Sequence, residues 1–167
     1  METAQTQDVE KLKKLIKDIK IGMLTTTEQG GWLHSRPMAT IECEFNGELW
    51  FFTRASAPKV DEVEREHHVN ISYASEKDHR FASVSGMAQL VRDKAKCAQL
   101  WNPLFKAWFP KGLDDPELAL LKVTLEKAEY WDTPPGAVVK VVGFAKALLT
   151  GKPYEPGENK KVDLARH

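Results

Sequence analysis

The sequence contains few cysteines and carries no excess charge. Its two cysteines, Cys43 and Cys97, lie far apart and form no CxxC pair, which argues against a disulfide framework or a structural zinc site. Lys+Arg and Asp+Glu each number 24, so the formal net charge is zero. Nucleic-acid-binding domains normally carry a basic excess. We therefore expect two buried thiols and no nucleic-acid partner.

Long apolar runs and the common catalytic motifs are missing too. No run approaches the roughly 20 apolar residues of a membrane-spanning helix, and the N-terminal Met-Glu-Thr-Ala-Gln lacks the regions of a signal peptide. The sequence contains no GxSxG, HExxH, GxxxxGK[ST] or GxGxxG. We expect a cytoplasmic protein without a membrane partner or a metal site.

Hydrophobic periodicity predicts short strands interrupted by helices. Strands are expected over 23–27, 32–44, 49–53, 69–75, 81–91 and 118–131, and helices over 8–20, 58–67, 93–101 and 136–150. Because short turns link most of the strands, this order favours a closed antiparallel barrel over a parallel sheet. We expect a single domain with N-terminal and C-terminal helices over residues 1–152, and a disordered polar tail over 153–167.

The stretch from His34 to Lys59 holds the most informative pattern. Asn46-Gly47 separates two β-rich runs, which is a strong hairpin signal and predicts that the strands on either side pair. Pro37 places its part of the first strand at an edge or a bulge. Gly86 marks a bulge or a close backbone approach in a later strand.

The second strand of this stretch runs into Ser56-Ala57-Pro58, which starts a helix whose free N–H groups can hold an anion. Lys59 lies in the first turn, where a cation is unfavourable for the helix and suggests a negative group opposite. Arg36 could add a second positive charge with a planar fork. Singly, these residues are ordinary surface cations; together they predict a phosphate site.

These residues also resemble a known family. Arg36-Pro37-Met38 on one strand, with Phe52-Thr53-x-x-Ser56-x-x-Lys59 at a strand-to-helix turn, resembles the FMN-binding split barrels of the pyridoxamine 5′-phosphate oxidase-like superfamily, above all the general stress protein branch. The resemblance runs from about Val9 to Trp131. It implies an α+β fold on a six-stranded antiparallel split barrel, FMN as cofactor, and a homodimer with shared flavin sites.

The resemblance also assigns residues to the flavin. Arg36, Thr53, Ser56 and Lys59 would meet the phosphate, and Pro37, Met38, Ala39 and Phe52 would line the ring edge with backbone groups. Trp108, Phe109 or Trp131 would reach the ring from the same or the other subunit. Catalytic side chains stay unknown, because a bound cofactor carries the chemistry and the protein tunes it.

The chain departs from true pyridoxamine phosphate oxidases at three places. It has Ala39-Thr40-Ile41-Glu42 where they carry a lysine, Pro58 where they carry an arginine, and Pro134-Pro135 near their C-terminal arginine motif. Oxidation of pyridoxamine phosphate is therefore not expected.

Three functions remain open from the sequence. The first is a flavin-dependent oxidoreductase with an unknown small substrate and with NAD(P)H or another small molecule as redox partner, and the second is a non-catalytic flavin-binding or storage protein. The third is a haem-handling split barrel that uses His34, His67, His68 or His79. The aromatic run from Trp101 to Phe109 is either a satellite hydrophobic cluster or a cover for a flat ligand or a partner subunit.

Overall fold

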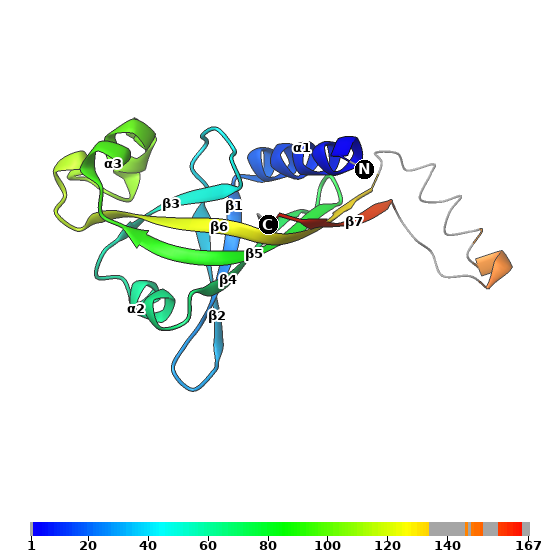
Figure 1. The fold of residues 1–167 in the computed structure, drawn as a ribbon, viewed down its shortest axis with the longest axis horizontal. Helices are drawn as coiled ribbons and strands as arrows, with labels where there is room; N and C mark the ends of the chain where they lie inside the picture. Colours follow the sequence, from blue (N-terminus) through cyan, green and yellow to red (C-terminus); the bar gives the residue numbers. More distant parts are fainter. Residues whose placement is uncertain (1, 134–145, 147, 152–156, 165–167) are drawn as a thin grey trace.

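A computed structural model describes residues 2–133, 146, 148–151 and 157–164, and it shows a curled sheet with helices around it (Figure 1). The helices are α1 (Glu2–Ile19), α2 (Pro58–Arg65) and α3 (Lys94–Leu100), with 3-10 turns η1 (Pro103–Ala107) and η2 (Gly112–Asp114). The strands are β1 (Ile21–Thr27), β2 (Leu33–Ala39), β3 (Glu48–Arg54), β4 (His68–Ser75), β5 (Arg80–Val91), β6 (Leu118–Asp132) and β7 (Glu158–Asp163).

The strands form one antiparallel sheet in the order β2-β1-β4-β5-β6-β3, and β7 also pairs with β6. The described strands β2 and β3 are therefore the two ends of this path. Helices pack against the curled sheet, so the antiparallel split barrel expected from the sequence is confirmed.

The predicted hairpin across Asn46-Gly47 is wrong. Strand β2 pairs with β1, and β3 pairs with β6. A type I′ turn needs positive φ at both central residues, but only Gly47 has it, at +89°. Residues 40–47 instead cross between the two end strands, where the Ile41 N–H donates to the Trp50 carbonyl at 2.8 Å.

Two predictions about special backbone positions are confirmed. Pro37 lies on β2, an end strand of the sheet, where its missing N–H breaks no ladder. At Gly86 the β5–β6 register shifts, and a Cβ there would lie 2.0 Å from the Thr124 carbonyl oxygen. Only glycine allows the two backbones to approach this closely.

Helices α1 and α2 cover the concave side of the sheet and fill one hydrophobic core. α1 contributes Leu12, Leu15 and Ile16, and α2 contributes Val63; the strands supply buried residues that include Leu24, Phe51, Ile71, Val84, Leu121 and Tyr130. The spacing of Leu12, Leu15 and Ile16 is the helical stripe that the sequence predicted.

A second hydrophobic cluster forms around Phe52 of β3, where β3 pairs with the start of β6. Residues of α3 and η1 pack against it. The Phe52 ring lies 4.8 Å from Phe105, 5.4 Å from Trp101 and 6.1 Å from Phe109, measured between ring centroids. These rings form the satellite cluster considered above, whereas Trp108 remains 60% exposed. Of the two thiols expected to be buried, Cys97 lies in this cluster, but Cys43 is exposed.

The C-terminal part of the chain differs from the expectation. Glu158–Asp163 was expected to be disordered but forms β7, which pairs with residues 127–132 of β6 and buries Val162. The expected helix over 136–150 lies mostly outside the described residues, although 148–150 are helical.

No helix among the described residues is both long enough and apolar enough to span a membrane.

Candidate functional site

Arg36 lies at the centre of a buried polar network between β2, β1 and α2. Its Nη2 donates to Glu62 Oε2 at 2.7 Å, and its Nη1 donates to the Thr26 hydroxyl. The Thr26 hydroxyl in turn donates to Glu62 Oε2. Thr26 and Glu62 are both buried, so the three side chains form a closed set of charge-assisted bonds.

The Glu62 carboxylate is ionised in this setting. Burial opposes its ionisation, but the hydrogen bonds from Thr26 and Arg36 and the charge of Arg36 outweigh burial and lower the pKa of Glu62. Glu62 therefore fixes the Arg36 guanidinium while neutralising part of its charge.

His34 and Glu28 extend this network. His34 Nδ1 lies 2.7 Å from Glu28 Oε1 and 2.9 Å from Arg36 Nη2. Glu28, His34 and Glu62 bring their ligand atoms within 4.8 Å of one another, a spacing that a metal ion could use. The Arg36 guanidinium, bonded to Glu62 and close to His34, already supplies a cation here.

Lys59 lies in the first turn of α2, which begins at Pro58 after Ala57 as its uncapped N-terminal residue. Burial and the nearby Arg36 charge lower the pKa of Lys59, and Glu62 only partly opposes them. Within the described residues, Lys59 makes no hydrogen bond or ion pair. Two cations thus lie close together, and one of them lacks a negative partner.

Thr53, near the end of β3, and Ser56, in the turn that follows, precede Lys59 in the chain. Thr53 is buried, and its hydroxyl makes only a long 3.4 Å hydrogen bond to the Arg54 carbonyl. Ser56 is exposed, and its N–H donates to Glu117 Oε2 at 3.0 Å. Hydrogen bonds from Ser56 lower the pKa of Glu117, so an internal carboxylate already contacts this turn.

The residues expected at the ring edge lie on the two end strands. Pro37, Met38 and Ala39 belong to β2, which pairs only with β1 among the described strands and so leaves backbone groups free on its other edge. The Phe52 side chain is buried in the aromatic cluster. Any contact of Phe52 with the edge of the flavin ring would therefore come from its backbone in β3.

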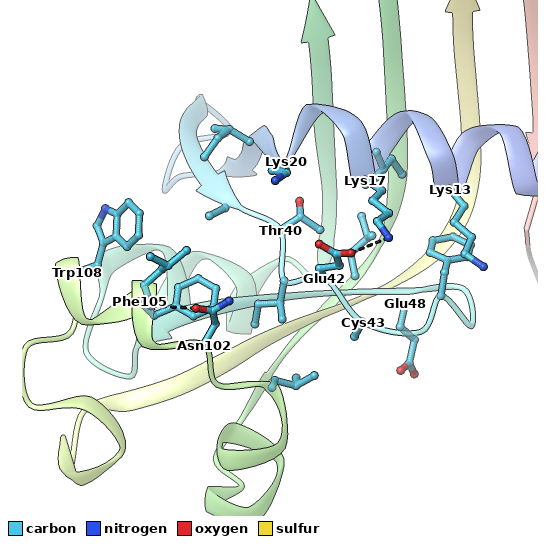
Figure 2. Close-up of a pocket in the computed structure, with 18 residues that line it drawn as sticks. Lys13, Lys17, Lys20, Thr40, Glu42, Cys43, Glu48, Asn102, Phe105 and Trp108 are labelled. Carbon is cyan, nitrogen blue, oxygen red and sulfur yellow. Dashed lines mark hydrogen bonds and ion pairs between the residues drawn. The ribbon is translucent and has the colours of Figure 1, made fainter.

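The two tryptophans lie in different places. Trp108 and Ala39 both line a cavity of about 690 Å³ next to η1 (Figure 2). Thr53 pairs with Ala119 near the start of β6, whereas Trp131 pairs with Phe81 near its end. At roughly 3.4 Å per residue, this separation is about 40 Å along the strand. One chain alone does not bring Trp131 to the phosphate residues.

Sequence reasoning missed Thr26, Glu62 and Glu117. Glu62 follows Lys59 by three positions, so the helical period already placed both on one face of α2. Thr26 and Glu117 carry no comparable local signal, because the sheet register and the turn before β6 bring them to the site.

Taken together, the curled antiparallel sheet, the arginine on its end strand and the lysine at a helix start define a split β-barrel with two neighbouring cations. The chain belongs to the pyridoxamine 5′-phosphate oxidase-like family, whose sequence model matches residues 7–155. Within the family it falls in the general stress protein branch.

Individual relatives agree with this placement. Protein bli-3 of Neurospora crassa is 32% identical over 157 residues, covering 88% of this chain and 75% of that protein. The general stress FMN/FAD binding protein of Xanthomonas citri is 32% identical, with a TM-score of 0.67 over 76% of this chain and 89% of that chain. General Stress Protein 26 of Bacillus anthracis shares the fold at 24% identity, with a TM-score of 0.64 over 72% of this chain and 91% of that chain.

Proposed function

We propose that this protein binds FMN through a phosphate site formed by Arg36 and Lys59. The observation that carries the proposal is the pair of neighbouring cations, Arg36 on β2 and Lys59 at the start of α2, of which Lys59 makes no ion pair within the described residues. A phosphate dianion would relieve the repulsion between them. The name of the Xanthomonas citri relative, an FMN/FAD binding protein, supports a flavin as the ligand.

The residues present fit such a ligand. Arg36 has five N–H donors and uses its two terminal nitrogens on Thr26, Glu62 and His34, so donor capacity remains. The hydroxyls of Thr53 and Ser56 would add bonds to the phosphate. Backbone groups of successive residues in β2 face opposite edges, and the Thr40 N–H, in phase with Met38, bonds to the Lys20 carbonyl on the β1 side. The free edge therefore offers the Pro37 carbonyl and the backbone groups of Ala39 to the rim of the ring, whereas Met38, proposed beside them, turns its backbone groups to β1.

We further propose that the protein is a flavin-dependent oxidoreductase with a small substrate. A bound flavin supplies electron transfer, while the side chains described above bind it and fix its orientation. Ala39-Thr40-Ile41-Glu42 at the end of β2 provides no lysine for pyridoxamine phosphate, so that substrate is not the one proposed.

A non-catalytic flavin binder would use the same residues. Stopped-flow mixing of the FMN-loaded protein with NADH or NADPH separates the two functions. Bleaching of the flavin absorbance at a useful rate supports the oxidoreductase. A flavin that no tested donor reduces supports a binding or storage role instead. The proposed location remains the cytoplasm.

The phosphate site is tested by substitution. Lys59→Ala and Arg36→Ala are each expected to weaken FMN binding by about 1.5 to 3 kcal/mol, the range for hydrogen bonds to charged groups. Arg65→Ala, at the other end of α2, is the matched control and should leave affinity unchanged. Because Arg36→Ala leaves the buried Glu62 carboxylate without its cationic partner, circular dichroism is used to check that this variant still folds. Unchanged affinity in Lys59→Ala would refute the site.

We also propose that the protein is a homodimer with flavin sites shared between subunits. The convex face of β1, β4, β5 and the end of β6 carries exposed Ile21, Met23, Phe81 and Trp131. Within the described residues, α3 packs against the outer side of the sheet at Trp50, Phe52 and Leu120, away from these four side chains. Burial against a second copy would cover these apolar side chains and could bring Trp131 to the partner's flavin.

A further inference from the structure

A cavity of about 690 Å³ lies apart from the Arg36 and Lys59 cations. It is bounded by the C-terminal half of α1, by residues 39–49 and by η1. Figure 2 shows Lys13, Lys17 and Lys20 on the α1 side and Phe105 and Trp108 on the opposite side. Its volume falls in the range of roughly 300 to 1,000 Å³ that is usual for small-molecule sites.

The cavity is apolar inside and apolar at its mouth. Ile16, Ile41 and Leu49 are buried side chains that form its inner wall. Leu104 and Trp108, which are 75% and 60% exposed, lie at its outer edge together with the half-exposed Ile21. Exposed apolar side chains gathered around one opening indicate a surface that a ligand or a partner covers.

The charged residues of the lining leave one positive charge in excess. The lining includes three lysines and two glutamates, Lys13, Lys17, Lys20, Glu42 and Glu48. Lys17 and Glu42 neutralise each other across 2.7 Å. Lys13 and Glu48 each reach an opposite charge outside the lining, at 3.7 and 3.6 Å.

Lys20 is the remaining cation. It is exposed just after the C-terminal end of α1, with a positive φ of 64°. No described acidic group lies within ion-pair distance of it; Glu42, which is paired with Lys17, attracts it only from further away. Its carbonyl accepts a hydrogen bond from the Thr40 N–H at 2.8 Å, which ties this residue to the segment that follows β2. A cation is therefore anchored at the mouth of an apolar cavity.

We propose that this cavity binds a small amphipathic monoanion, a carboxylate with an aliphatic or aromatic body. The carboxylate would face Lys20, and the apolar body would lie between Ile41 and Trp108. Ala39 lies in both the cavity wall and β2, so a ligand here would abut the strand assigned to the flavin ring. Only its role as a substrate rests on the proposed flavin function; binding itself does not.

The first test is titration calorimetry of the full-length, flavin-free protein with octanoate and with 1-octanol. Octanoate should bind saturably and about fivefold more tightly than octanol, which is the upper range for an exposed ion pair. Lys20→Gln should remove this preference. Lys14→Gln, an exposed lysine on the same helix outside the lining, should keep it. Equal binding of octanoate and octanol to the native protein, or no saturable binding, would overturn the proposal.

The second test uses the two thiols. Cys43 is exposed in the cavity lining, and Cys97 is buried outside it. Octanoate should slow the reaction of Cys43 with a disulfide reagent in native protein but not in Lys20→Gln. An unchanged rate in the presence of saturating octanoate would place the ligand elsewhere and refute the site.

Repeating the calorimetry with FMN separates this proposal from the flavin function. Octanoate binding that persists in FMN-saturated protein supports two sites. Displacement of FMN by octanoate would mean that the cavity is the flavin site itself and would overturn the proposal of a separate one. If FMN does not bind but octanoate does, the flavin function fails while the anion site stands.

Discussion

Glu62 is the residue on which the arginine of the candidate site depends. It is 5% exposed, and it accepts hydrogen bonds from both Arg36 and Thr26. A buried carboxylate in this position holds the guanidinium in one orientation at the edge of the sheet. The cost is that part of the positive charge offered to a phosphate is already neutralised.

Glu62→Gln should lower the free energy of unfolding by about 1.5 to 3 kcal/mol at pH 7, because charged hydrogen bonds are lost. The pKa of Glu62 is lower in the folded state than its ordinary 4.5. Its stabilising contribution is therefore complete above about pH 4.5 and is lost as the pH falls through the folded-state pKa. Urea denaturation at pH 7 and pH 3 should show a difference between the two proteins that shrinks in acid. A difference of equal size at both pH values would contradict this.

Glu117 has the opposite effect on the site, because its carboxylate contacts the Ser56 N–H where an anion would bind. Glu117→Gln should tighten FMN binding by about 0.3 to 1 kcal/mol, the size of a charge effect near a helix start. Glu126→Gln, a partly buried glutamate further along β6 and away from the turn, is the control. Fluorescence titration with FMN measures both, and weaker binding in Glu117→Gln would show that this carboxylate supports the ligand instead.

At the scale of the element, β7 changes the expected role of the C-terminal segment. It pairs with residues 127–132 of β6, buries Val162, and places Glu158 against Lys11 of α1. The strand therefore joins the end of the chain to its first helix through the longest strand of the sheet.

Removal of residues 153–167 should destabilise the fold by about 2 kcal/mol or more, since burying one valine side chain alone contributes roughly that much. Val162→Ala tests the apolar contact by itself, and Lys161→Ala, exposed at the preceding position, is the control. Thermal melts followed by circular dichroism give the comparison. A truncated protein with an unchanged melting temperature would show that β7 adds no stability.

The strands and helices were predictable where they carry a periodic apolar pattern. Leu12, Leu15 and Ile16 marked α1, and the alternation in β5 and β6 marked two long strands. The pattern failed at β7, whose only buried residue is Val162, because pairing with β6 and not local preference makes it a strand.

The site was predictable to a similar degree. Arg36 and Lys59 do lie near each other, as their placement on a strand and at a helix start suggested. The side chains that bond Arg36 and partly neutralise it could not be predicted from the sequence. The hairpin signal at Asn46-Gly47 was overridden by longer registers with β1 and β6, so the neighbours of β2 were assigned wrongly.

At the scale of the whole molecule, the apolar convex face bears on assembly. Sedimentation velocity should give a dimer for the native chain. Phe81→Glu should produce monomers, because a charge would have to be buried at the interface. Trp32→Glu is the control, since this side chain is 76% exposed in the turn after β1. A native monomer that still binds FMN would contradict a flavin site shared between subunits.

The hydrogen bond from Ile41 to Trp50 joins the two open margins of the barrel, and Ile41 also lines the proposed anion cavity. A ligand in the cavity should therefore stabilise the hydrogen bond that joins these two margins. The amide proton of Ile41 would exchange with deuterium more slowly once the cavity is filled. That one proton could report, from inside the fold, whether the protein has found its natural small molecule in a crude extract.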